Sequence, residues 1–254
     1  MYPREVVDEA LRLKQQGWTD RAVAEQCEVS IWTVRHWRTG RRRRAGRKAA
    51  SRHSPCPRCE QKEIDAFAYS YLLGLYLGDG HISRAPRSHR LSIYCSTCWP
   101  GIMEEGEAVM RRVIPASVYR QQRSEGCTAL IATAKHWPCL FPQHGAGMKH
   151  TRKIELEPWQ QTMVDAHPDR LIRGLIHSDG CRSINRIRKK SPDGDKFYEY
   201  PRYFFYNVST DIMRLCGETL DRLGIAWKMN NWNSLSIARK DAVAEMDRIV
   251  GPKY

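Results

Sequence analysis

The feature that most constrains the fold of this chain is a nine-residue stretch that occurs twice. The first copy is Leu72-Leu-Gly-Leu-Tyr-Leu-Gly-Asp-Gly80, and the second is Ile172-Arg-Gly-Leu-Ile-His-Ser-Asp-Gly180. The two aspartates fall at positions 79 and 179, a spacing of 100 residues. Self-similarity at a fixed, domain-sized period predicts two structural repeats.

Each copy predicts a helix that ends at its aspartate, because glycine just past the last helical residue is a common stop. Small residues four positions apart lie on one helix face and let two backbones approach closely. Each copy holds such a pair, Gly74 with Gly78 and Gly174 with Ser178. We therefore expect the two helices to pack together, with Asp79 and Asp179 side by side at their ends.

Two apposed carboxylates at helix C-termini repel each other, so one stays protonated unless a cation enters. Oxygen-only ligands favour Mg²⁺ or Ca²⁺. An acid pair holding such metals suits phosphodiester cleavage, in which metals activate water and stabilise the leaving oxygen. The alternative is that each stretch is only a core helix with a C-terminal cap, which two copies at this spacing make less favoured.

The two stretches resemble the signature of the LAGLIDADG homing endonucleases, in the single-chain, two-repeat form, over residues 65–250. The resemblance implies two αββαββα halves with the signature helices at their interface. It also implies that Asp79 and Asp179 are catalytic residues and ligands of the metal. Leu77 and His177 stand where the signature has an earlier acid, a position that varies within the family.

Periodicity outside the signature predicts the same element order in both halves. Residues 89–96, for example, alternate between apolar and polar side chains as a strand with one buried face does. The expected strands are 81–85, 89–96, 118–123, 127–133, 181–188, 200–207, 226–229 and 234–238, with helices at 100–113, near Trp137, at 209–223 and at 241–249. The predicted class is α+β, with repeats at 65–140 and 169–254 joined by a connecting segment at 141–168.

The resemblance further implies that the two sheets form a saddle on DNA. The strand residues expected to face DNA are Arg84, Arg90, Ser92, Tyr94, Arg120, Gln122, Arg182, Arg186, Arg188 and Arg202. In the family a lysine near the end of the fourth strand lies by the scissile phosphate, which makes Lys135 and Lys240 catalytic candidates. The alternative for the strand residues is that they only face solvent. The alternative for Lys135 and Lys240 is that they are ordinary solvated lysines at strand ends.

Residues 1–40 predict a small all-α module of three helices, with Thr19 and Ser30 as caps of the second and third. The run from Ala24 to Trp37 resembles the bacterial helix-turn-helix, although Glu28 stands where that pattern usually has glycine. The outward residues of the third helix expected to contact DNA are Trp32, Thr33, Arg35, His36 and Arg38, while Val34 and Trp37 are expected in the core. The alternative is a three-helix bundle that contacts protein.

A basic arm and linker follow at residues 41–64. The arm opens with Arg41, Arg42, Arg43 and Arg44 and contains no acid up to Arg52. Such a run is often only a solvated tail. Directly after a recognition helix, we expect it to lie along phosphates or in the minor groove of DNA.

The linker holds a Cys-x2-Cys pair, Cys56 and Cys59, which is half of a zinc site by its spacing. A second pair, Cys95 and Cys98, completes a formal four-cysteine set for structural Zn²⁺. A site built from Cys139 with His136, His144 or His150 is a further option by residue type. The alternative is that the first cysteine pair only belongs to a tight turn and that the second pair consists of ordinary core thiols.

Composition limits the class of partner. The net charge of +14 indicates a polyanion, most simply nucleic acid, and the resemblance makes double-stranded DNA the expected partner. No apolar run approaches the about 18 residues that a membrane span needs, so no membrane partner is expected. Nine scattered cysteines, an odd number, argue against a disulfide framework and for a reducing cytoplasm. With DNA as its expected partner, we expect the protein to associate with the nucleoid. Because both repeats lie in one chain, we expect a monomer.

The sequence thus predicts a site-specific endonuclease that makes metal-dependent double-strand cuts. The competing hypothesis is a non-catalytic transcription regulator that keeps the fold for DNA binding. The N-terminal module favours the regulator, and the retention of both acids favours the enzyme. A splicing cofactor that binds RNA has less support.

Overall fold

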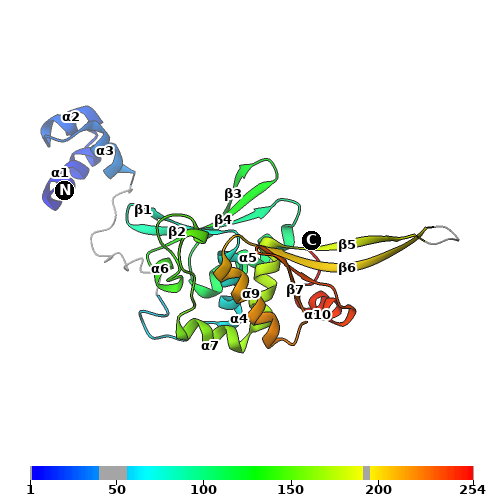
Figure 1. The fold of residues 1–254 in the computed structure, drawn as a ribbon. Coiled ribbons are helices and arrows are strands. Elements are labelled where there is room, and N and C mark those ends of the chain that lie inside the picture. Colours follow the sequence, from blue (N-terminus) through cyan, green and yellow to red (C-terminus); the bar gives the residue numbers. More distant parts are fainter. Residues whose placement is uncertain (1, 40–55, 191–194, 254) are drawn as a thin grey trace. The chain divides into compact units, whose positions relative to one another are not determined.

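The computed structural model describes residues 2–39, 56–190 and 195–253, which form two units divided between positions 52 and 53 (Figure 1). Each unit is described by itself. Every helix within those ranges is too short or too polar to span a bilayer.

The first unit consists of the three predicted helices, α1 (Arg4–Gln15), α2 (Asp20–Gln26) and α3 (Ile31–Arg38). Thr19 and Ser30 cap α2 and α3, because their side-chain oxygens accept hydrogen bonds from the backbone N–H groups of Ala22 and Thr33. A small core joins the helices, formed by Ala10, Leu13, Val23, Ala24 and Val34.

The turn between α2 and α3 keeps a left-handed backbone at Glu28, whose φ is 52°. This is the conformation that glycine adopts most readily, and a side chain there costs on the order of 1 kcal/mol. The turn therefore adopts the backbone conformation that glycine favours, even though Glu28 occupies the position.

The second unit contains two repeats of the same element order. The first repeat comprises α4 (Ala66–Leu77), β1 (Gly80–Ala85), β2 (Ser88–Ser96), α5 (Pro100–Val113), β3 (Val118–Ser124), β4 (Cys127–Ala134) and α6 (Trp137–Leu140). A short 3₁₀ helix η1 (Lys149–Thr151) and α7 (Pro158–Ala166) connect it to the second. The second repeat comprises α8 (Pro168–Asp179), β5 (Gly180–Lys189), β6 (Lys196–Tyr206), α9 (Thr210–Arg222), β7 (Lys228–Asn231), β8 (Ser234–Ile237) and α10 (Lys240–Val250).

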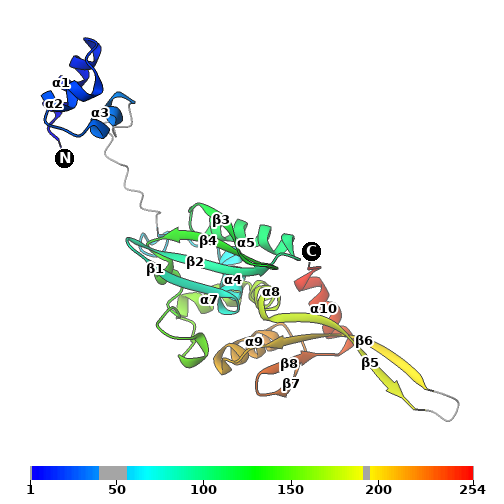
Figure 2. The ribbon, with the colours of Figure 1, turned by 90° about the horizontal axis from the view of Figure 1, so that it is seen from above.

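Both repeats build a four-stranded antiparallel sheet with the same topology, β1-β2-β4-β3 in the first and β5-β6-β8-β7 in the second. The predicted α+β class and its pseudo-symmetry are confirmed. One difference is the length of the β5–β6 hairpin, which projects beyond the rest of the unit in Figures 1 and 2. Its pairing continues to Lys189↔Lys196, beyond the predicted start of the second strand at residue 200. Backbone hydrogen bonds between antiparallel strands do not depend on the side chains, so the hairpin extends into a polar segment that has no alternating pattern.

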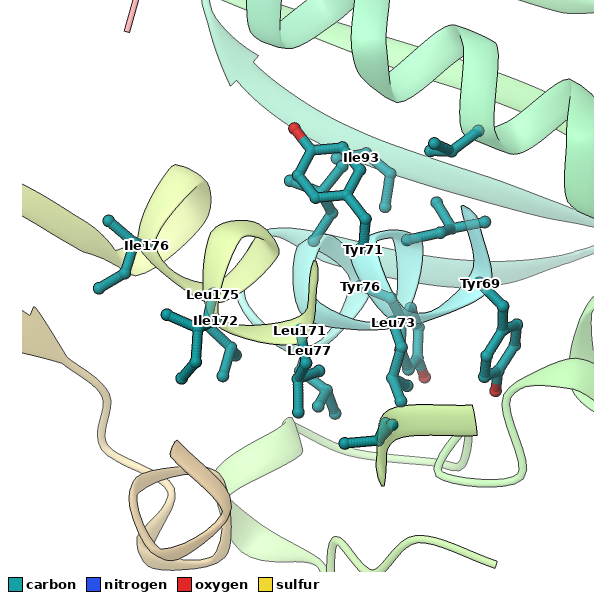
Figure 3. Close-up of a cluster of buried hydrophobic side chains, with 14 of the residues drawn as sticks. Tyr69, Tyr71, Leu73, Tyr76, Leu77, Ile93, Leu171, Ile172, Leu175 and Ile176 are labelled. Carbon is teal, nitrogen blue, oxygen red and sulfur yellow. The ribbon is translucent and has the colours of Figure 1, made fainter. Parts of the chain in front are cut away.

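Helices α4 and α8 lie side by side at the centre of this unit (Figure 3). Their backbones almost touch: a Cβ added to Gly74 would lie 2.8 Å from the Cα of Gly174, and one added to Gly174 would lie 2.4 Å from the carbonyl oxygen of Tyr71. The close packing predicted from the small residues is confirmed.

Helix α4 is buried on all sides, as expected for a helix that is apolar around its whole circumference. In Figure 3, Tyr71 points toward Ile93 of β2, whereas Leu73 and Leu77 point to the opposite side of α4. The signature helix of the first repeat is thus the centre of the hydrophobic core of the second unit.

Polar contacts also join the two repeats. Glu105 of α5 accepts hydrogen bonds from Arg170 and Arg173 of α8, at 2.6 and 2.8 Å from their Nη2 atoms. His177 accepts a bond from the Tyr71 hydroxyl at Nδ1 and donates from Nε2 to the Val250 carbonyl. Burial lowers the pKa of His177 to about 4, so the ring is neutral and acts as a bridge inside the core.

We predict that Gly74→Ala destabilises the second unit by about 2–4 kcal/mol, because the new methyl group would overlap backbone atoms of α8 that cannot move separately. Thermal or urea unfolding measures the change. Gly145→Ala is the matched control, since a Cβ there lies 3.5 Å from the flexible side chain of Arg152. Equal stability of the two variants would contradict the close packing.

Candidate functional site

Asp79 and Asp179 end the two central helices, so the packing of α4 on α8 determines their positions. A Cβ added to Gly78 would lie 3.0 Å from Asp179 Oδ2, so the end of α4 lies in close contact with the end of α8. Both carboxyl groups are half-buried. The predicted apposition of the two acids is present in the structure.

The electrostatics of this pair are unfavourable for two negative charges. Burial and, to a lesser extent, the nearby charge of Asp179 together raise the pKa of Asp79 to about 6, although Lys149 and Lys253 oppose the shift. Burial also raises the pKa of Asp179, and a 2.7 Å hydrogen bond from the Asn207 side-chain amide to Oδ2 partly offsets that effect. The protein therefore holds the two acids where a cation would favour their ionised forms.

Two lysines that the sequence analysis did not identify lie beside the acids. Lys149 donates to the last two carbonyls of α4, those of Tyr76 and Leu77, and to that of Gly78 just beyond the helix, at 2.5–2.9 Å. Lys253 donates to the carbonyl of Gly180 at 2.7 Å. Burial lowers the pKa of both ammonium groups, that of Lys149 to about 8, while the carboxylates of Asp79 and Asp179 oppose the shift.

A comparison of the two repeats could have found these lysines. Lys149 and Lys253 follow Asp79 and Asp179 by 70 and 74 residues, so they occupy corresponding places after their signature helices. Both lie outside the predicted strands, and no local pattern distinguishes them from other loop cations.

A cavity opens on either side of the acid pair, and the two cavities correspond under the pseudo-symmetry. One, of about 630 Å³, is lined by Asp79, Ser178 and Lys253 among others. The other, of about 410 Å³, is lined by Asp179, Gly78 and Lys149. Each cavity combines one acid with one lysine and takes residues from both repeats.

Lys135 and Lys240 lie just after β4 and at the first position of α10, and both side chains are exposed. The positive charges that act on Asp79 and Asp179 come from Lys149 and Lys253. Lys135 and Lys240 therefore remain sequence-based candidates, and the structure gives them no contact with the acid pair among the described residues.

The register of the first sheet corrects part of the predicted DNA face. Arg90, Ser92 and Tyr94 share the face of β2 opposite to the buried Leu91 and Ile93, as predicted. The face predicted for Arg84, Arg120 and Gln122 was wrong. Arg120 pairs with Leu130 and Gln122 with Thr128, so both share the core side of the sheet, and Arg84 follows Ile82 on that side.

Contacts explain why a long basic side chain is tolerated on the core side. Arg120 donates to Glu107 of α5 at 2.5 Å and Arg111 donates to the same carboxylate. The residues of β3 that the register places on the open face are instead Tyr119 and Gln121.

The second sheet requires a similar correction. Arg182, Arg186 and Arg188 share the face of the buried Tyr203 and Phe205, and each pairs with a carboxylate, those of Asp247, Glu199 and Asp195. Arg202 lies on the opposite, open face, as predicted. Aromatic side chains flank it there along β6, namely Tyr198, Tyr200, Phe204 and Tyr206, which stack in two neighbouring pairs.

The third helix of the first unit presents its predicted outward side chains. Trp32 is 71% exposed, His36 is exposed, and Arg35 and Arg38 lie near the carboxylate of Asp20. Thr33 is half-buried and its hydroxyl contacts that of Ser30. Val34 is buried in the core and Trp37 packs against it, as predicted. Arg41, Arg42, Arg43 and Arg44 lie outside the described residues.

The predicted four-cysteine set does not form. Cys95 is buried on β2 facing the core, and Cys98 is exposed beyond the end of that strand. The side chains that meet Cys56 and Cys59 are His136 and Cys139. A strand fixes the direction of Cys95, and its core-facing position keeps it from the linker cysteines.

Comparisons with known proteins concern the fold. No protein-family model and no curated protein matches the sequence. Among solved structures, the N-terminal LAGLIDADG domain of DUF199/WhiA is similar, with 13% identity, a TM-score of 0.46, and coverage of 74% of this chain and 83% of that one.

The I-SmaMI LAGLIDADG homing endonuclease bound to cleaved DNA has 10% identity, a TM-score of 0.44, and coverage of 74% and 84%. The homing endonuclease I-WcaI bound to its DNA recognition sequence has 15% identity, a TM-score of 0.43, and coverage of 76% and 85%. Identities this low say nothing about activity. The second unit itself repeats one order of helices and strands around a central pair of helices, as the resemblance of the sequence predicts.

We predict that Asp79→Asn stabilises the protein above pH 7. Folding raises the pKa of Asp79 from its ordinary value of 3.8 to about 6. The protonated carboxyl group therefore contributes its full stabilisation of the fold below pH 3.8, and this contribution is lost as the pH rises toward 6. Removing the charge should raise the free energy of unfolding by up to about 3 kcal/mol at pH 8, and by progressively less as the pH falls toward 4. Thermal unfolding across this range tests it. An Asn variant that is less stable than the native chain at pH 8 would contradict the electrostatic conflict.

Proposed function

We propose that this chain binds double-stranded DNA and cuts it at specific sites with the help of a divalent cation. The observation that carries the proposal is the convergence of Asp79 and Asp179 at the ends of two packed helices, with both pKa values raised. A protein that only bound DNA would gain no stability from this arrangement.

The residues around the acid pair fit a hard cation. The donors are the two carboxylates, with oxygen atoms only, and a cation between them would relieve their mutual repulsion. Asp79 and Asp179 would hold Mg²⁺. When bound, the ion would activate water and stabilise the leaving oxygen of a phosphodiester.

Lys149 and Lys253 have a separate role in this proposal. Each places an ammonium group in one of the two cavities, where it would stabilise the negative charge that develops on a phosphate. Lys149 is cationic at neutral pH, because its pKa is about 8. Two cavities of corresponding construction suit one cut in each DNA strand, and both are complete within one chain, which favours a monomer.

The open faces of the two sheets would contact DNA through residues such as Arg90, Tyr94 and Arg202. The exposed side of α3, with Trp32 and His36, would extend the footprint. The net charge of +14 supports a polyanionic partner and predicts strongly salt-dependent binding.

A second function, that of a non-catalytic transcription regulator, is favoured by a specific observation. Lys149 and Lys253 already offset the charge of the acids without any metal. A chain with such internal compensation and a separate three-helix unit could bind an operator without cutting it.

Cleavage of a randomised plasmid library in Mg²⁺ decides between the two functions. We expect double-strand cuts that disappear with Asp79→Asn and with Asp179→Asn. The matched control is Asp241→Asn, which removes an exposed acid paired with Arg239 and should cut normally. Salt-sensitive binding to a discrete sequence, with no cutting and no effect of either signature substitution, would establish the regulator instead.

The corrected sheet faces give a further test. We predict that Arg90→Ala weakens binding to the selected DNA site and lowers the slope of log K against log salt by about 1, as expected for one lost phosphate contact. Arg120→Ala is the control, because Glu107 holds that side chain on the core side. Equal effects of the two substitutions on the salt slope would contradict the assignment of the open face.

A further inference from the structure

A cluster of sulfur and nitrogen ligands lies apart from the acid pair. Cys56 and Cys59 belong to a turn that precedes α4, and His136 and Cys139 belong to the segment that begins α6. Each of the four offers one ligand atom, and these atoms all lie within 4.8 Å of one another. Two segments about 80 residues apart in the chain thus meet through metal-capable side chains.

The three distances that join Cys59, His136 and Cys139 match those around a tetrahedral zinc ion, and Cys56 Sγ lies within 4.8 Å of each of their ligand atoms. Zn–S bonds of about 2.3 Å and Zn–N bonds of about 2.0 Å place two sulfur ligands about 3.8 Å apart and a sulfur and a nitrogen about 3.5 Å apart. In the structure, Cys59 Sγ lies 3.8 Å from Cys139 Sγ, and His136 Nδ1 lies 3.5 and 3.6 Å from those two sulfurs. A disulfide would need about 2.0 Å between sulfurs.

Both segments are fixed by contacts that do not involve the four ligands. Trp137 is fully buried and donates from Nε1 to the carbonyl of Ala132 at 3.0 Å, which anchors the His-Trp-Pro-Cys segment in the core. In the Cys-Pro-Arg-Cys turn, Lys62 donates its N–H to the carbonyl of Pro57 at 2.7 Å. The positions of the ligands are therefore largely set by the fold.

Arg58, between the two linker cysteines, joins the segments directly. Its Nη1 donates to the carbonyl of Cys139 at 3.0 Å, and its guanidinium lies 4.7 Å from the ring centre of Trp159. The backbone N–H of Cys59 also points at Cys56 Sγ, at 3.5 Å, an arrangement that stabilises a thiolate. Cys59 is exposed, which provides a path for a metal to enter.

We propose that Cys56, Cys59, His136 and Cys139 form a structural Zn²⁺ site. Four protein ligands complete a tetrahedral shell, so the site is closed and serves structure rather than catalysis. The bound ion fastens the segment that leads into α4 to the segment that leaves β4. It thereby gives the linker between the two units a fixed attachment on the first repeat.

The first test is the zinc content of the purified full-length chain after dialysis. We expect one zinc per chain in the native protein and in Cys98→Ser, which removes an exposed thiol outside the cluster. Cys139→Ser should lose the zinc, and Cys139→His should retain it because imidazole is also a zinc ligand. A native chain without stoichiometric zinc, or full zinc in Cys139→Ser, would overturn the proposal.

A second test uses only the native chain, so it does not depend on whether a variant folds. Alkylation of individual cysteines, followed by mass spectrometry, compares the exposed thiols of Cys59 and Cys98. We expect a chelator to raise the alkylation rate of Cys59 by roughly tenfold or more and to leave that of Cys98 unchanged. Equal rates for the two thiols in zinc-containing protein would refute the site. Neither test measures DNA cleavage, so their outcomes are independent of the proposed function.

Discussion

The close contact between the backbones of α4 and α8 is the constraint on which the rest of the second unit depends. It requires Gly74 and Gly174, because any side chain there would overlap the opposite helix. It brings Asp79 and Asp179 together at the helix ends, and it holds the two sheets in their pseudo-symmetric relation. A shift of one helix along the other would separate the acids and open the core around Tyr71 and Ile93.

This packing has an electrostatic cost that the protein offsets only in part. Two carboxylates at helix C-termini face each other's charge and the negative ends of two backbone dipoles. Lys149 and Lys253 reduce the cost by donating to carbonyls at or just beyond those ends. Since each cavity is lined by residues of both repeats, and Lys149 comes from the segment that connects them, neither repeat alone contains a complete site.

Two other features of the second unit, the His177 bridge and the cysteine and histidine cluster, connect segments that are distant in sequence. His177 occupies a place where the resembled signature has an acid, yet here it is a neutral bridge between Tyr71 and Val250. The cysteine and histidine cluster joins segments far apart in sequence, and closing such a long loop is where a metal crosslink stabilises most. His177 forms part of the wall of the larger cavity, whereas the cysteine and histidine cluster lines neither cavity.

Sequence alone determined the elements and the central pair of helices, because caps, alternation and helix stops are local signals. Thr19, Ser30 and the paired small residues each act within a few positions. The faces of β3 and β5 were harder, since strands such as Tyr119–Arg123 are almost wholly polar and carry little to mark an inward side. Phe204 and Phe205 likewise put aromatic side chains on both faces of β6.

Only the tertiary structure decided which distant side chains meet. Lys149 joins the acid pair, and His136 joins Cys59, through segments that no local pattern relates. The register of whole sheets, set by many backbone hydrogen bonds at once, placed Arg120 against Glu107 and left Arg90 open. Local chemistry specifies the pieces of this protein, whereas the packing of one helix against another specifies what those pieces form together.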